Sequence, residues 1–144
     1  FLQRLQDNFS NDRFSYAGFD LAKIPIEFCE RNYAKKGAQF YSGGLPSKMA
    51  DFSVMSGTFN FAPDLTVNAW RNYLFSSLNS IWNLTRCSMI FNLMISNEDK
   101  ITSQSISYIR QETILNFCQS NFGATSKYFS SKLPREITLC ISKI

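Results

Sequence analysis

The longest amphipathic pattern in the chain follows Pro63. Its apolar residues lie three or four positions apart: Trp70, Leu74, Leu78, Ile81 and Trp82. This spacing predicts a helix of about five turns at 3.6 residues per turn. Asp64 is the predicted N-cap, because a short acidic side chain can accept a hydrogen bond from a free backbone N–H in the first turn.

Three other segments also carry helical spacing, at residues 2–9, 24–37 and 103–122. Pro25 fits the first position of the second helix, where its missing N–H costs no hydrogen bond. Gly123 fits the C-terminal cap of the third helix, which we expect to begin at Ser103. The pattern therefore predicts four helices in a chain of 144 residues.

The spacing is ambiguous in four places. Residues 52–61 alternate around Ser56–Gly57, which predicts a short hairpin, although an irregular loop is the competing interpretation. Residues 88–95 form an almost continuous apolar run that fits either a helix end or a buried strand. Residues 125–132 suggest a turn. Residues 134–144 favour a helix that begins at Pro134, with a strand as the alternative.

The fold that follows is a single domain spanning residues 1–144. We expect it to be mainly α, a small helical bundle that disulfides staple together, with room for one short β-hairpin. The hydrophobic fraction of 44% is sufficient for a core of this size.

The four cysteines are the residues that would form the expected disulfides. Cys29, Cys87, Cys118 and Cys140 are far apart and lie on or beside predicted apolar helix faces. An even number of distant cysteines is typical of a disulfide framework in an oxidising compartment. The simplest pairing joins Cys118 to Cys140 and Cys29 to Cys87, and four buried thiols are the alternative. The spacing does not fit a zinc site, so no metal site is predicted.

The chain contains no histidine. This absence excludes Ser–His–Asp and Cys–His nucleophiles and histidine-based zinc hydrolases. The 11 acidic residues suggest no paired site, and Glu98 and Asp99 are interpreted as solvated loop residues. The protein is therefore predicted not to be an enzyme, and no cofactor is predicted.

The net charge, the apolar runs, the first residue and two short motifs indicate the expected partners and compartment of the protein. The net charge of +4 is scattered, which argues against nucleic acid and suits docking on an acidic protein partner. No apolar run is long enough to span a membrane. The first residue is Phe1 and not Met, which suggests a mature secreted form or an excised domain. Asn8 and Asn83 begin Asn-x-Ser/Thr sequences and are candidate glycosylation sites.

Aromatic residues with polar atoms are the candidate ligand contacts: Trp70, Tyr73, Trp82 and Tyr108. They would line an apolar cavity if the core held a small hydrophobic molecule. The first functional hypothesis is a secreted, non-catalytic protein-interaction module of the effector or inhibitor type. The alternatives are a carrier of a small hydrophobic ligand or lipid, and an accessory subunit of an intracellular complex.

Overall fold

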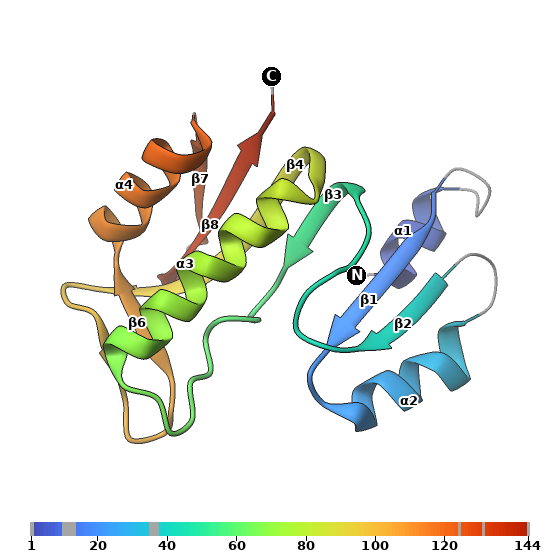
Figure 1. The fold of residues 1–144 in the computed structure, drawn as a ribbon, viewed down its shortest axis with the longest axis horizontal. Coiled ribbons are helices and arrows are strands. Elements are labelled where there is room, and N and C mark those ends of the chain that lie inside the picture. Colours follow the sequence, from blue (N-terminus) through green and yellow to red (C-terminus); the bar gives the residue numbers. More distant parts are fainter. Residues whose placement is uncertain (1, 10–13, 35–37, 124, 131, 144) are drawn as a thin grey trace. The chain divides into compact units, whose positions relative to one another are not determined.

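The structure is a computed structural model that describes residues 2–9, 14–34, 38–123, 125–130 and 132–143 (Figure 1). It divides into two compact units, Phe1–Pro46 and Ser47–Ile144. Each unit contains parallel strands that are connected through a helix, the arrangement of an α/β fold.

The first unit consists of α1 (Leu2–Asn8), β1 (Tyr16–Asp20), α2 (Lys23–Tyr33) and β2 (Ala38–Ser42). The two strands are parallel and in register from the Tyr16–Ala38 pair to the Asp20–Ser42 pair. Gly18 sits in the middle of β1, where an added Cβ would lie 2.9 Å from the ring of Phe40. The absence of a side chain at Gly18 therefore lets the Phe40 ring pack directly against β1.

The second unit contains the larger sheet. Its strands are β3 (Ala50–Met55), β4 (Thr85–Ser96), β5 (Lys100–Ile101), β6 (Ser107–Arg110), β7 (Thr125–Ser130) and β8 (Leu133–Ser142). Their order is β5-β6-β4-β8-β7, and β3 pairs with the first part of β4. β3 and β6 run parallel to β4, whereas β8 runs antiparallel to both β4 and β7.

Two helices, α3 (Val67–Asn83) and α4 (Gln111–Phe122), pack on one face of this sheet (Figure 1). β4 alternates accordingly: Met89, Phe91 and Leu93 are buried, whereas Ile90 is half-buried on the other face. The buried side chains of β4 and β8 meet those of α3 and α4 in one core, which contains Trp70, Leu74, Ile114 and Ile137 among others.

The predicted mainly helical bundle is wrong, because the second unit is built around a multi-stranded sheet. Residues 88–95 belong to β4, residues 125–130 to β7 and residues 134–142 to β8. A short apolar run fits a buried strand as well as a buried helix, and only pairing with distant segments distinguishes the two. Helices are confirmed near residues 2–8, 23–33, 67–83 and 111–122, whereas Lys35, Lys36 and Gly37 of the predicted helix 24–37 lie outside the described residues.

The predicted hairpin at 52–61 is also wrong. β3 ends at Met55, and the strand pairs in parallel with the distant β4 and not with residues 59–61. The predicted helix 103–122 begins only after Arg110, because residues 107–110 form β6. The Thr102 hydroxyl accepts a hydrogen bond from the Ile106 N–H at 3.1 Å, a local bond that competes with a helical start.

The N-cap of α3 is Thr66 and not Asp64. The Thr66 hydroxyl accepts a hydrogen bond from the Ala69 N–H at 3.2 Å. Asp64 lies earlier, in a left-handed conformation with φ of 58°. Both residue types can cap a helix, so only the backbone geometry identifies the one that does.

The predicted disulfides are wrong as well, because all four cysteines are free thiols. Cys118 is buried in the core, on the face of the sheet that α4 covers. Cys140 is paired in register with Ile90, and its buried neighbours Leu139 and Ile141 point to the opposite face. The two sulfur atoms that were predicted to form a disulfide therefore lie on opposite faces of the sheet.

Candidate functional site

In open α/β folds, ligands bind beyond the carboxyl ends of parallel strands. Three such ends carry polar residues here: β1 ends at Asp20, β3 is followed by residues 56–66, and β4 is followed by Asn97–Asp99. The first belongs to the first unit and the other two belong to the second unit. Each end is described separately below.

The loop after β3 is held by hydrogen bonds from strand β4. The Asn92 side-chain oxygen accepts from the Gly57 N–H at 2.6 Å, and the Asn60 side-chain oxygen accepts from the Met94 N–H at 3.1 Å. Gly57 has φ of 71°, a left-handed conformation that glycine adopts without steric cost. The loop therefore leaves β3 through a sharp turn that β4 fixes in place.

The carbonyl of Phe59 connects this loop to α3 and β6 through hydrogen bonds. It accepts hydrogen bonds from Trp70 Nε1 of α3 at 2.9 Å and from the Ser107 hydroxyl of β6 at 2.8 Å. All three residues are buried. Tyr73, one turn further along α3, packs edge-on against the Phe59 ring with centroids 6.2 Å apart and remains 43% exposed. The accessible ring of Tyr73 on α3 thus lies beside a loop that hydrogen bonds hold in place.

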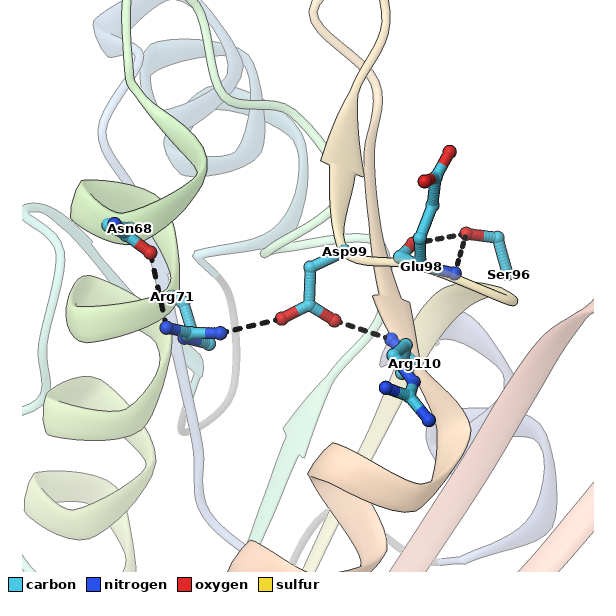
Figure 2. A network of polar contacts seen from close by, with 6 residues as sticks. All are labelled: Asn68, Arg71, Ser96, Glu98, Asp99 and Arg110. Carbon is cyan, nitrogen blue, oxygen red and sulfur yellow. Dashed lines mark hydrogen bonds and ion pairs between the residues drawn. The ribbon is translucent and has the colours of Figure 1, made fainter.

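A polar network centred on Asp99 follows the end of β4 (Figure 2). Asp99 Oδ2 accepts from the guanidinium of Arg71 on α3 at 2.9 Å, and Oδ1 accepts from the Arg110 N–H at 2.7 Å. Arg71 also donates to the side chain of Asn68 at 3.1 Å. Nearby, the Ser96 hydroxyl donates to the carbonyl of Glu98. The network joins α3, the segment after β4 and the start of α4.

The interpretation of Asp99 as a solvated loop residue is wrong, since its side chain is only 11% exposed. A carboxylate that is partly removed from water requires compensation, and the Arg71 guanidinium provides it. Glu98 agrees with the prediction, because its side chain is 73% exposed and only 3.6 Å from Lys100 Nζ. With both oxygens of Asp99 already bonded, its role is to position the end of β4 relative to α3.

In the first unit, Asp20 ends β1 and faces the start of α2. Its Oδ1 accepts a hydrogen bond from the Ala22 N–H at 2.8 Å, and its backbone carbonyl accepts from the Gly43 N–H at 2.9 Å. Asp20 is exposed, and its Oδ2 has no hydrogen bond to any residue that the structure describes. The carboxylate is therefore fixed in direction and still able to accept from a ligand.

The four predicted ligand contacts do not form one cavity wall. Trp70 and Tyr73 both meet Phe59, but Trp70 is buried as a core residue. Trp82 packs on Phe122 near the other end of α3, and Lys143 Nζ lies 4.7 Å from its ring centroid. Tyr108 is on β6, with Lys100 Nζ 6.0 Å from its ring centroid. The ligand-binding role of these residues stays a prediction.

The candidate glycosylation sites lie at helix ends. Asn8 is the last residue of α1, and Asn83 is the last residue of α3. Both side chains are exposed, whereas Thr85, the third residue of the second sequence, is fully buried. Their modification stays a prediction.

Sequence reasoning missed Asp20, Asn60 and Asp99. One signal was present: each follows an apolar or aromatic segment that turns out to be a strand. Had these segments been assigned as strands, the rule about carboxyl ends would have singled out the same residues.

The described residues contain neither a candidate membrane-spanning helix nor a candidate metal cluster. In the described ranges, no helix is both long and apolar enough to cross a membrane. The same part of the chain contains no group of three or more Cys, Asp or Glu placed to hold a metal ion.

Comparison with known proteins shows the fold. No protein family and no curated protein matches the sequence. Among solved structures, the chain is similar to a SAM-dependent methyltransferase from Leishmania major, with a TM-score of 0.63 and 13% identity, covering 97% of this chain and 60% of that one. It is also similar to the SAM-bound magnesium protoporphyrin IX methyltransferase of Synechocystis PCC 6803, with a TM-score of 0.60 and 9% identity over 89% of this chain and 59% of that one.

A third similar structure is the DhpI–SAH complex, with a TM-score of 0.58 and 9% identity over 88% of this chain and 64% of that one. The chain thus spans less than two thirds of the length of these three structures. At such identities the similarity establishes a Rossmann-like methyltransferase fold and nothing finer.

These matches correct the predicted function. A secreted, non-catalytic interaction module or lipid carrier was inferred from a disulfide-stapled helical bundle, and neither the bundle nor the disulfides exist. The prediction that the protein is not an enzyme is overturned by the similarity to methyltransferases. The absence of histidine excludes only mechanisms that use a histidine side chain. Methyl transfer from a sulfonium group does not require one.

Proposed function

We propose that these 144 residues belong to an S-adenosylmethionine-dependent methyltransferase. The observation that carries the proposal is the similarity to SAM-dependent methyltransferases over almost the whole of this chain. The polar residues at the carboxyl ends of β1, β3 and β4 support it, because ligands of open α/β folds bind at those ends.

Asp20 is the residue that we assign to the methyl donor. In nucleotide-binding α/β folds an acidic residue after a strand accepts hydrogen bonds from ribose hydroxyls, and S-adenosylmethionine contains a ribose. Asp20 fits this role because its carboxylate is exposed and oriented by the Ala22 N–H. Bound S-adenosylmethionine would supply an electrophilic methyl group on sulfur.

The fit is partial, since the sequence has no glycine-rich turn between a strand and a helix. Its six glycines contain only one adjacent pair, Gly43–Gly44, which follows β2 and precedes no helix directly. Such turns let a backbone approach a nucleotide closely. We therefore assign the ribose contact to this chain and assign no residue of it to the remainder of the donor.

The second unit has a candidate contact surface of its own, on the loop after β3. Thr58 and Phe61 are exposed there, and Tyr73 presents an accessible ring beside Phe59. This surface suits an apolar or aromatic molecule. Without histidine, any proton acceptor must be a carboxylate, a tyrosine or a lysine.

The test is calorimetric titration of S-adenosylmethionine into the protein. Asp20→Asn removes a charged hydrogen-bond acceptor, so affinity should fall by about 10- to 100-fold, equivalent to roughly 1.5–3 kcal/mol. Asp7→Asn is the matched control, because Asp7 is exposed in the same unit and bonds only locally, to Gln3. Its affinity should be unchanged.

Absence of S-adenosylmethionine binding at millimolar concentration would refute the proposal. Binding that Asp20→Asn leaves intact would refute the role of Asp20 alone. Secretion and a protein partner stay predictions, and the free thiols remove the main support that the cysteines gave to an oxidising compartment.

A further inference from the structure

The side chain of Asn60, on the loop after β3, fills a gap between two strands. On the edge of β4 that faces away from β8, β3 pairs as far as Phe91 and β6 pairs from Ile95. Between these two positions, the Asn60 side-chain oxygen accepts a hydrogen bond from the Met94 N–H at 3.1 Å. Asn60 therefore takes the place of a strand backbone at this point, beyond the carboxyl end of β3.

The backbone of Asn60 is fixed as well. Its N–H donates to the Gly57 carbonyl at 3.2 Å, and its carbonyl accepts from the Ser107 N–H at 3.0 Å. Both backbone groups and the side-chain oxygen are thus bonded to partners inside the second unit. The side-chain nitrogen, Nδ2, has no hydrogen-bond acceptor among the residues of the second unit that the structure describes.

These bonds decide which way the side-chain amide of Asn60 is oriented. The oxygen and the nitrogen of an asparagine side chain have nearly the same shape, and the hydrogen-bond partners determine which atom lies where. A flip of Asn60 would set its N–H groups against the Met94 N–H and lose that bond. Nδ2 therefore offers its donors in a fixed direction, and a molecule bound there must supply a hydrogen-bond acceptor.

The residues around Asn60 indicate what else such a molecule carries. Asn60 is half-buried, and its neighbour Phe61 is 61% exposed. The accessible ring of Tyr73 packs against Phe59 on the same loop. An apolar, aromatic surface with a few fixed polar groups is typical of sites for small molecules, and in open α/β folds these sites lie beyond the carboxyl ends of parallel strands.

We propose that the side-chain amide of Asn60 donates a hydrogen bond to an oxygen of a small bound molecule, a carboxylate or carbonyl oxygen carried by an aromatic or apolar group. A carboxylate is the stronger acceptor of the two, because hydrogen bonds to a charged group are stronger than those between neutral groups. An ammonium group only donates hydrogen bonds and does not fit this position. The proposal concerns the second unit alone and stands whether or not the chain binds S-adenosylmethionine.

The test is titration of the isotope-labelled protein with benzoate, which combines an aromatic ring with a carboxylate, in the absence of S-adenosylmethionine. NMR spectra follow the side-chain amide signals, and the signals of Asn60 are the pair that Asn60→Asp removes. Benzoate should shift this pair progressively until the site is saturated. Benzylammonium, which has the same ring and a donor in place of the acceptor, should leave the pair unmoved.

A comparison of variants gives a second readout. Asn60→Asp keeps an oxygen that can accept from the Met94 N–H and replaces the N–H donors by a negative charge. The affinity for benzoate should fall at least about tenfold in this variant. Asn68→Asp is the matched control, because it makes the same change in the same unit, at a residue whose oxygen is bonded to Arg71. Its affinity for benzoate should be unchanged.

Asn60 signals that benzoate does not shift, or that benzylammonium shifts as strongly, would overturn the proposal. Equal affinity of Asn60→Asp and the unchanged protein for benzoate would overturn it too. The backbone signal of Met94 shows in each variant whether the loop keeps its place. Because neither readout uses the methyl donor, failure here and failure of the proposed function are distinguishable.

Discussion

The two units of the chain use similar residues with very different results. Among the described residues of the second unit, sixteen buried residues from strands, helices and the loop after β3 form one core. In the first unit, the buried apolar residues among those described are Leu2, Ile26 and Ala38. Both units contain parallel strands connected through helices, so topology alone does not create a core.

Exposed apolar side chains make the contrast clear. Along α2 and the turn before it, Leu21 is 72% exposed, Ile24 is 79% exposed and Phe28 is 54% exposed. A two-stranded sheet is marginal in water unless more surface covers it. The larger core of the second unit therefore contributes most of the burial of apolar side chains in this chain.

The largest expected effect comes from the core of the second unit. Leu74→Ala removes a side chain with 0% exposure and should lower the free energy of unfolding by about 2–5 kcal/mol. Ile26→Ala, the counterpart in the first unit, should leave the main urea transition almost unchanged. Equal losses for the two variants in urea denaturation would remove the distinction between the units.

A smaller effect is expected at the Asp99 network. Asp99→Ala leaves Arg71 and the Arg110 N–H without their acceptor, which should cost about 1–3 kcal/mol. Glu98→Ala is the adjacent control, since its exposed contact with Lys100 is worth less than about 1 kcal/mol. A similar loss for both variants in thermal or urea unfolding would show that the ion pair does not fix the end of β4.

Alkaline pH should destabilise the folded chain through the buried Cys118 thiol. Burial raises the pKa of the Cys118 thiol from its ordinary value of 9.0 to about 12. Between these values the unfolded chain has lost this proton while the folded chain keeps it, so stability falls as pH rises, by up to about 1.4 kcal/mol per pH unit.

Cys118→Ala should reduce this alkaline slope in urea titrations between pH 9.0 and about 12. The unchanged protein, titrated in parallel, is the control for the other groups that titrate in this range. An unaltered slope in Cys118→Ala would mean that other groups cause the pH dependence.

The smallest expected effect is at the start of α3. Thr66→Ala removes the hydroxyl that accepts from the Ala69 N–H and should cost about 1 kcal/mol. Ser80→Ala, later in the same helix, removes a hydroxyl that donates only to the Ser76 carbonyl and should change stability little. If Thr66→Ala unfolds at the same urea concentration as Ser80→Ala, Thr66 does not cap the helix.

How far the sequence predicts the fold depends on how local each element is. The stripe from Trp70 to Trp82 identified α3, because helical spacing is a property of one segment. Residues 134–144 left helix and strand open, because Ile137, Cys140 and Ile141 also fit helical spacing and the pairing partners of β8 lie in β4 and β7.

The residues of the candidate site also differ in how far the sequence near each of them predicts its role. Tyr73 was singled out from its residue type, and it does lie beside the loop after β3. Asp99 was assigned to solvent, because nothing in the adjacent residues indicates that Arg71, in another element, would bury and pair with it. Asp20 was missed because its meaning depends on β1 being a strand with a parallel partner.

The amino-acid pattern was therefore sufficient to locate α3 and, through the absence of histidine, to exclude the mechanisms that need this residue. That Cys118 and Cys140 lie on opposite faces of a sheet, and that Asp99 is partly buried beside Arg71, follows only from the packing of distant segments. The physical reason is that a helix satisfies its backbone hydrogen bonds within one segment, whereas a strand depends on residues far away in the chain.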